Sequence, residues 1–570
     1  MAIKKYIADA DNTITNAYAP DLNQRSTGSN AGRADVMDIY SIYGRYSTSS
    51  VELSRALVKF PITSISADRT SGNIPASGNV NFYLRLFNAE HSQTVPQDYT
   101  LTIMAVSQSW QEGDGLDLIN YKDKTNGNIG SNWMSASNTR KWTDIHGKIL
   151  AGGSYHTSSV KSSDPATFNQ EQHIFNKDFD TGIEDLEIDI TPLVEQWIAG
   201  TYNNYGVGIM LSASFEGKHS GSADGSHPRR PGEVYPVTTE SEGDEGIIYN
   251  PSGSTESYYI KRFFSRGTQY FFKKPCIEAR WDDSKRDNRG NFYYSSSLAD
   301  RYDNLNTLYF YNYVRGELKD IPNLGSDKRI YVSIFSGNLD NNAPSASAGG
   351  HPSASCQVLS VDGNTHGVNS TNLLVATGGI VSTGIYSCSL AFTGSSDLTR
   401  IFDVWFTGSL NTKAAFSTTA TVFFTGSVDP VTLAASEIKS RPTYYINITN
   451  IKDHYRNDEV ARMGLYIRDR NWSTNVYTKA NEDIENTNIQ SASYRVFRVI
   501  DALECVPYGT GSELETSLSY DVSGNYFDFD MSLLEAGYEY GFKFAFYDNS
   551  LKTWKEQPYV FKFRVEDYEY

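Results

Sequence analysis

Carboxylates near the N-terminus have a spacing that could bind calcium. Asp9 and Asp11 stand where an EF-hand loop places its first two ligands. That loop needs Gly at its sixth position and a bidentate Glu at its twelfth, whereas Ile14 and Pro20 stand there. The EF-hand interpretation therefore fails. Asp9 or Asp11 could still bind Ca²⁺ with backbone carbonyls, and ordinary turn carboxylates are the simpler interpretation.

A second set of metal-ligating residue types lies in a long insertion, residues 217–246. Gly and Ser are frequent in this insertion, so no helix or strand would hold a ligand set in fixed geometry. We predict a flexible surface loop, which would contact a neighbouring subunit if it has any role. The residues concerned are His219, Asp224, His227, Asp244 and Glu245.

Patterns of catalytic residues are weak throughout the chain. Asp282 and Asp283 could be proposed as glycosidase carboxylates, but the sequence does not define the separation of about 5 to 10 Å that such a pair needs. The chain has no Gly-x-Ser-x-Gly elbow, no P-loop and no His-Glu-x-x-His motif. We therefore predict that the protein is not an enzyme and has no catalytic, cofactor-binding or metal-binding residues.

The clearest signals for secondary structure lie between residues 186 and 211. They predict a strand, a helix of about two turns and another strand. Thr191 suits the N-cap, and Pro192 suits the first helical position. Gly200 suits the left-handed residue that ends the helix.

The predicted helix has one apolar face. Leu193, Val194 and Trp197 lie three and four residues apart, which places them on the same side. We expect this face to be buried against a sheet.

These features resemble DNRLRE-type domains, which are jelly-roll β-sandwich modules of the carbohydrate-binding kind. Residues 54–60 resemble the family's early strand, in which Arg or Lys precedes a buried Leu and Phe. Trp110-Gln-Glu112 resembles its Trp-x-Glu, and residues 275–281 are similar to its closing strand. The resemblance covers the first half of the chain, and the insertion at 217–246 departs from it. The signature residues that it implies are Arg55, Phe60, Trp110, Glu112, Asp189, Pro192, Trp197, Gly200 and Gly206.

Aromatic residues are abundant enough for several roles. The chain has 39 Tyr, 28 Phe and 8 Trp, which could fill cores, stack on sugars or line subunit interfaces. Trp110 and Trp197 are predicted to be structural. Trp133 and Trp142 lie in an irregular stretch, residues 114–152, and we predict them as exposed binding aromatics.

The whole chain is predicted to be all-β, with three tandem β-sandwich domains. Residues 1–283 would form the jelly roll, with one short helix and the insertion. A polar linker follows, and residues 284–436 would form a central β-sandwich. Residues 437–570 would form an immunoglobulin- or fibronectin-like sandwich. Gly537 and Tyr540 there resemble a tyrosine corner, in which the Tyr hydroxyl binds a backbone group and the ring fills the end of the core.

Composition excludes several classes of partner. The net charge of −17 argues against nucleic acid and against an anionic membrane surface. No uninterrupted apolar window is long enough to span a membrane, and no apolar core like that of a secretion signal follows Lys4 and Lys5. The cysteines are far apart and predict reduced thiols: Cys276, Cys356, Cys388 and Cys505. A bond between Cys356 and Cys388, within one domain, stays open as the alternative.

An extracellular kind of fold without an export signal suggests assembly in a host cytoplasm and release by lysis. The chain also resembles virion structural proteins of marine, T4-like contractile-tailed phages, beginning with residues 9–18. We therefore expect a neck, tail, baseplate or fibre component that binds copies of itself and other virion proteins. The alternative is a glycan-binding attachment protein that uses exposed aromatics of the jelly roll.

Overall fold

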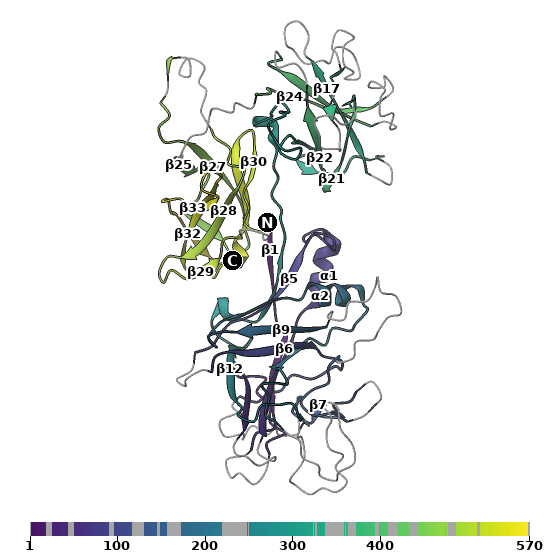
Figure 1. The fold of residues 1–570 in the computed structure, drawn as a ribbon, viewed down its shortest axis with the longest axis vertical. Helices are drawn as coiled ribbons and strands as arrows, with labels where there is room; N and C mark the ends of the chain where they lie inside the picture. The colour runs from purple at the N-terminus through teal and green to yellow at the C-terminus, as the bar shows by residue number, and fades with distance from the viewer. Residues whose placement is uncertain are drawn as a thin grey trace. The chain divides into compact units, whose positions relative to one another are not determined.

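The structure is a computed structural model. It describes residues 2–567 except 19–24, 44–50, 91–95, 117–129, 145–146, 148, 157–172, 219–247, 249, 323, 325–327, 337–357, 360, 363–371, 394–397, 408–419, 433–442, 474, 477–485 and 510–513. The chain divides into two compact units, which we call the N-terminal unit (Ala2–Trp281) and the C-terminal unit (Asp282–Tyr570). Strands dominate both units (Figure 1), so the predicted all-β fold is confirmed.

The N-terminal unit contains two main sheets. The four-stranded sheet has the order β1 (Ile3–Ile7), β13 (Cys276–Arg280), β5 (Asn81–Leu86) and β10 (Leu186–Asp189). The seven-stranded sheet has the order β12 (Tyr258–Phe264), β3 (Val36–Tyr43), β4 (Val51–Lys59), β11 (Val207–Leu211), β6 (Tyr99–Ala105) and β9 (Ile174–Phe179), with β2 (Ala10–Thr15) also on β4. A small hairpin joins β7 (Ser135–Ser137) to β8 (Arg140–Lys141), and a 3₁₀ turn, η1 (Phe271–Lys273), precedes β13.

One hydrophobic core lies between the two sheets. Leu84 and Ile277 of the four-stranded sheet belong to the same buried cluster as Val58 and Ile103 of the seven-stranded sheet. Alternate residues of each strand point inward, as a strand with one buried face requires. The unit is therefore a β-sandwich, as predicted.

Helix α2 (Thr191–Ala199) is the predicted short helix. Its apolar face is buried through Leu193, Val194 and Trp197, and Gly200 ends it with a φ of 73°. The prediction that Thr191 caps the helix is wrong, because the Thr191 hydroxyl instead accepts a hydrogen bond of 2.7 Å from the Phe82 amide. The side chain thus connects the start of the helix to β5.

A second helix, α1 (Ile62–Ser71), was not predicted, so the expected single helix is wrong. Its sequence is rich in Ser and Thr, and Ile65 is its one buried residue, which leaves no apolar stripe to indicate a helix. Figure 1 shows α1 beside α2. Arg69 of α1 binds Glu195 of α2, with 2.7 Å between Nη2 and Oε1.

The C-terminal unit begins with a central lobe, a sheet folded around its own core. The order is β20 (Asn372–Leu373), β19 (Val361–Asp362), β22 (Ile385–Phe392), β21 (Ala376–Ser382), β17 (Ile330–Ser336), β23 (Ile401–Phe406) and β24 (Val422–Val428). In addition, β14 (Asn306–Tyr311) pairs with β22, and β18 (Val358–Leu359) with β17. A hairpin of β15 (Tyr313–Val314) and β16 (Glu317–Leu318) follows β14. Trp405 is fully buried in the core.

The C-terminal lobe is a sandwich of two sheets. One has the order β25 (Tyr444–Ile448), β27 (Val460–Asp469), β31 (Gly524–Asp530) and β30 (Ser519–Asp521). The other has the order β26 (His454–Arg456), β34 (Phe561–Glu566), β32 (Glu539–Asp548), β28 (Ala492–Arg498) and β29 (Glu504–Val506), with β33 (Thr553–Glu556) on β32. Tyr494 of β28 stacks on Phe527 of β31 with 4.4 Å between ring centroids, so the sheets face each other.

The predicted tyrosine corner is present in this lobe. The Tyr540 hydroxyl donates to the Glu535 carbonyl at 2.6 Å, and the Tyr540 side chain is fully buried. Gly537 has a φ of 91°, which favours glycine over residues with a Cβ, and its amide donates to the Val565 carbonyl at 2.8 Å. The 3₁₀ turn η3 (Met531–Leu533) leads into this corner.

Residues 285–291 contact both lobes of the C-terminal unit. Lys285 and Asp287 exchange backbone hydrogen bonds of 2.9 and 3.0 Å with Tyr520 of β30. The 3₁₀ turn η2 (Asn288–Gly290) follows, and Arg289 binds Asp403 of β23, with 2.6 Å between Nη1 and Oδ1. The predicted linker residues therefore pair with the C-terminal lobe through Tyr520 and with the central lobe through Asp403, and both lobes follow them in the sequence.

The described cysteines, Cys276, Cys388 and Cys505, are buried thiols, whereas Cys356 lies outside the described residues. Burial raises the pKa of Cys276 and of Cys388 to about 12.

Within the part of the chain that the structure describes, no helix combines the length and the apolar character that a membrane crossing requires.

Candidate functional site

The signature residue Arg55 faces a second core on the outer side of β4. Ala56 and Val58 point into the core between the sheets, whereas Leu53 and Leu57 point the other way. That opposite side is covered by the chain between β6 and β9. We call the buried cluster there the second core: Ile14, Val51, Leu53, Leu57, Val106, Trp133, Ala136, Trp142, Ala151 and Ile248. Both faces of β4 are thus buried.

Trp133 and Trp142 are part of the second core, so the prediction that they are exposed is wrong. Both side chains have an exposed fraction of 0%. The Trp142 indole N–H donates to the Asn132 carbonyl at 2.8 Å, which satisfies its polar atom inside the core. Trp110 is half-buried, and its indole N–H donates to the Tyr205 carbonyl at 2.7 Å. These rings therefore do not form a sugar-stacking platform.

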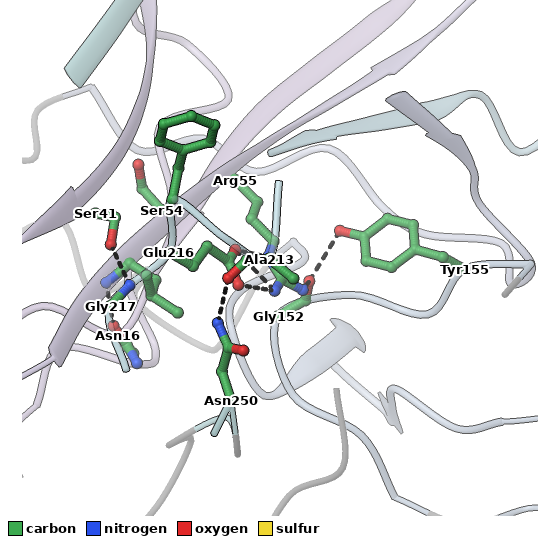
Figure 2. Close-up of polar contacts among 12 residues, drawn as sticks. Asn16, Ser41, Ser54, Arg55, Gly152, Tyr155, Ala213, Glu216, Gly217 and Asn250 are labelled. Atoms are coloured by element: carbon green, nitrogen blue, oxygen red, sulfur yellow. Dashed lines mark hydrogen bonds and ion pairs between the residues drawn. The ribbon is translucent and has the colours of Figure 1, made fainter. Parts of the chain in front are cut away.

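Arg55 and Glu216 form a buried ion pair at the edge of the second core (Figure 2). Arg55 Nη2 lies 3.0 Å from Glu216 Oε1, and Nη1 donates to the Gly152 carbonyl at 3.0 Å. The guanidinium carbon lies 5.5 Å from the centroid of Trp133. Burial opposes the charge of Arg55, but the Glu216 carboxylate outweighs burial and raises the Arg55 pKa above its usual value.

Hydrogen bonds around the pair fix the backbone segment that carries Glu216. Ser41 accepts from the Gly217 amide at 2.8 Å, and Asn250 donates to the Ala213 carbonyl at 2.7 Å. Figure 2 shows both contacts beside the ion pair. Tyr155 donates to the same Gly152 carbonyl that Arg55 binds, at 2.8 Å. Burial raises the pKa of Tyr155 to about 12. The cluster is internally bonded, and this arrangement positions residues rather than presenting a reactive group.

Glu112 of the Trp-x-Glu motif belongs to another polar cluster. It binds Arg266, with 2.6 Å between Nη2 and Oε2, and accepts from the Asp11 amide at 2.9 Å. Asp11 in turn accepts a short hydrogen bond from the Arg266 amide. Burial, together with the nearby Glu112 charge, raises the pKa of Asp11 to about 7.

The calcium site considered for Asp9 and Asp11 is not supported by this geometry. Asp11 is buried in β2 and engaged with Arg266, whereas Asp9 is exposed. No group of three or more His, Cys, Asp or Glu gathers anywhere among the described residues in a way that could hold a metal ion. The five polar residues of the insertion, from His219 to Glu245, lie outside the described residues.

The remaining signature residues shape the backbone. Asp189 accepts from the Thr191 amide at 2.8 Å and so orders the start of α2, whose first turn contains Pro192. Gly206 has a φ of 82°, and a Cβ there would lie 2.1 Å from the Val58 carbonyl oxygen. Phe60 is buried in the core between the sheets. Asp282, from the acid pair, accepts from the Ser284 amide at 2.9 Å, as in an Asx turn.

A histidine pair, not predicted from the sequence, lies at the end of β6. His156 donates its amide to the Ala105 carbonyl at 3.0 Å, and Ala105 donates its amide to the His173 carbonyl at 3.0 Å. The two imidazole centroids are 5.9 Å apart, and the Tyr202 ring lies 4.8 Å from that of His156. Burial lowers the pKa of both imidazoles, and the neighbouring His173 lowers that of His156 further.

Lys261 of β12 is a second group that the sequence did not reveal, because a lysine in a strand normally faces solvent. Its side chain is buried, and burial lowers the pKa of its ammonium to about 8. The ammonium lies 4.9 Å from the ring centroid of Phe179 and 5.0 Å from that of Phe263. Its three acceptors are Asn88 Oδ1 at 2.8 Å, Gly182 O at 3.0 Å and Glu184 O at 2.7 Å.

Charged residues on the outer face of the four-stranded sheet also bind one another. Glu278 of β13 lies 2.7 Å from Arg280 Nη2, and 3.2 Å from both Lys5 Nζ and Arg85 Nη1. Burial alone would raise the pKa of Glu278, but the three cations lower it to about 2. The register of β1, β13 and β5 places these side chains side by side.

Neither a protein-family model nor a curated protein matches the chain.

Proposed function

We propose that this chain is a non-enzymatic structural protein of a tailed-phage particle, in the neck, tail, baseplate or fibre apparatus. It would act through contacts with copies of itself and with other virion proteins, after assembly in the host cytoplasm. The proposal combines the sequence resemblance with an all-β architecture in which successive sandwiches offer sheet edges and loops for association.

The observation that carries the proposal is the internal pairing of buried charges. Arg55 binds Glu216, Glu278 binds three cations, and Arg289 binds Asp403. Catalytic sites instead tend to keep titratable groups poised in a cleft for a substrate. Buried ion pairs with several hydrogen bonds fix the geometry of a frame, which is what a repeated assembly contact needs.

The surface offers apolar residues for such contacts. Large hydrophobic side chains are exposed in both units, and aromatic residues are favoured at protein interfaces. Examples with more than half of their surface exposed are Tyr258, Leu298, Tyr302, Tyr313, Val460, Ile500 and Val522.

Immunogold electron microscopy of intact particles from the source lysate tests the proposal. Label at one fixed place on the particle, in a constant number per particle, is the expected result and would identify the part. Label absent from particles, with the protein free in the lysate, would contradict it. Particles blocked with unlabelled antibody serve as the control for non-specific gold.

Glycan binding is the second candidate function, and the aromatic residue that would bind the sugar differs from the two predicted. Trp133 and Trp142 are buried, but Tyr258 of β12 is 65% exposed and stacks on Tyr259 with 5.7 Å between centroids and an interplanar angle of 5°. Such a ring face can stack on a sugar. A glycan array tests this candidate: signal lost in Tyr258→Ala but kept in Tyr302→Ala, whose ring lies in the other unit, would favour it over assembly alone.

A further inference from the structure

We infer that His156 and His173 form a binding site for one divalent transition-metal ion of the zinc, copper or nickel class. The inference does not depend on the proposed virion function. It rests on the spacing of the two imidazoles, on the burial of one of them and on the backbone that holds both.

The spacing of the rings fits a shared metal ion. An imidazole nitrogen binds Zn²⁺ at about 2.0 to 2.1 Å, so an ion bound to two imidazoles lies about 3.2 Å from each ring centroid. Two such rings have centroids up to about 6.4 Å apart, depending on the angle at the metal. The observed 5.9 Å between His156 and His173 falls inside this limit and exceeds the roughly 5.2 Å of a tetrahedral pair, so the rings would move slightly toward each other on binding.

The Nε2 atom of His173 lacks a hydrogen-bond partner among the described residues. The residue is 5% exposed, and this atom is buried. A buried polar atom of this kind costs free energy unless something binds it. A metal ion supplies that missing interaction by accepting the lone pair of the ring nitrogen, because neutral imidazole is a common transition-metal ligand.

The backbone holds the two ligands at fixed positions. His156 and His173 bind the carbonyl and the amide of one residue, Ala105, so their Cα atoms are tied to the end of β6. His173 directly precedes β9, which pairs with β6 over its whole length. Two ligands on neighbouring backbone segments of a sheet lose little freedom when an ion binds.

The ligand chemistry selects the class of ion. Two nitrogen ligands suit Zn²⁺, Cu²⁺ and Ni²⁺, whereas Ca²⁺ and Mg²⁺ prefer carboxylate and carbonyl oxygens. Since two imidazoles fill only part of a coordination sphere, water would complete it. The site would therefore hold the ion less tightly than a structural site with four protein ligands.

Isothermal titration of the full-length chain, without a histidine tag, with ZnCl₂ at pH 7.5 tests the inference. We expect one saturable ion per chain that His156→Ala weakens at least tenfold. His173→Gln should weaken it to a similar extent. The matched control is His454→Ala, which removes an exposed histidine of the C-terminal lobe paired with Glu566 at 2.8 Å and should leave the affinity within twofold.

A second measurement needs no variant and covers the case in which a change at buried His173 prevents folding. Electron paramagnetic resonance of the parent chain loaded with one equivalent of Cu²⁺ should show superhyperfine coupling to two imidazole nitrogens. The inference is overturned if the parent binds no Zn²⁺, if His156→Ala binds as tightly as the parent, or if the copper spectrum shows fewer than two nitrogens.

Discussion

Arg55 shows how a charged side chain can be held inside a hydrophobic core. Its guanidinium lies between Glu216, the Gly152 carbonyl and the Trp133 ring, and each contact replaces part of the hydration that burial removed. The pairing matters for stability because a buried charge without a partner is strongly unfavourable. The residue that resembles a family signature is therefore an internal support of the second core.

Removing one partner of this pair should be costly. We expect Arg55→Met to lower the free energy of unfolding by about 3 to 5 kcal/mol, because Glu216 would remain buried without its cation. The double variant Arg55→Met with Glu216→Leu should recover most of that loss. Urea unfolding followed by tryptophan fluorescence measures both, and equal stability of the single variant and the parent would show that the pair contributes nothing.

Asp11 should make the stability of the N-terminal unit depend on pH. Its folded pKa of about 7 lies above the usual value, so the folded state holds a proton that the unfolded state releases. The stabilising contribution is thus present in acid and is lost as pH rises through about 7. Asp11→Asn keeps an acceptor for the Arg266 amide and removes the charge.

Thermal unfolding of both forms at pH 5 and pH 8 tests this expectation. Asp11→Asn should melt above the parent at pH 8, and the difference should shrink at pH 5, where the parent carboxyl is protonated. A variant that melts below the parent at pH 8 by as much as at pH 5 would show that Asp11 is charged in the folded protein.

Two glycines at the ends of secondary-structure elements are required for different reasons, one for its backbone conformation and the other for lack of space. Gly200, after α2, has a φ of 73° with nothing within 4 Å of an added Cβ, whereas a Cβ at Gly206 would lie 2.1 Å from the Val58 carbonyl oxygen. Gly200→Ala should cost about 1 to 2 kcal/mol, the penalty of the left-handed conformation. Gly206→Ala should cost clearly more, because β4 or β11 must shift as well.

Denaturant unfolding of the two glycine variants under identical conditions gives the comparison. Similar losses of stability at both positions would mean that the strands accommodate the added methyl group at Gly206 without displacement.

Some elements could be predicted from sequence because local signals agreed, and others could not. For α2, proline, glycine and an apolar face all pointed to the same helix. For α1, polar residues hid a helix that is held by its packing and by Arg69.

Trp133 and Trp142 were misplaced because their stretch has no periodicity, although β4 itself offered a signal. Apolar residues at both odd and even positions of β4 indicate a strand buried on two faces, which something must cover.

The histidine pair and Lys261 could not be predicted, for a related reason. His156 and His173 are separated by 16 residues in the chain and meet only because both bind Ala105. Lys261 is buried because two phenylalanine rings and three acceptors surround its ammonium, and all but one of these come from other elements. Contacts of this kind depend on tertiary structure and leave no local pattern.

At the scale of the whole molecule, the chain is built from sandwiches with separate cores, so a local change should stay local. Tyr540→Phe removes the hydroxyl that binds Glu535 and should destabilise the C-terminal lobe by about 1 kcal/mol. Hydrogen exchange followed by mass spectrometry should show faster exchange in residues 443–567 and unchanged exchange in the N-terminal unit. Faster exchange throughout the chain would show that the units unfold together.

The three described cysteines are distributed one to each sandwich: Cys276 in β13, Cys388 in β22 and Cys505 in β29. Each sulfur is shielded from reagents while its own sandwich stays closed. An alkylating reagent would therefore mark a sandwich only when that sandwich opens, and peptide mapping would tell which one had opened. The order in which the three sulfurs become labelled on warming would therefore report the order in which the three sandwiches unfold.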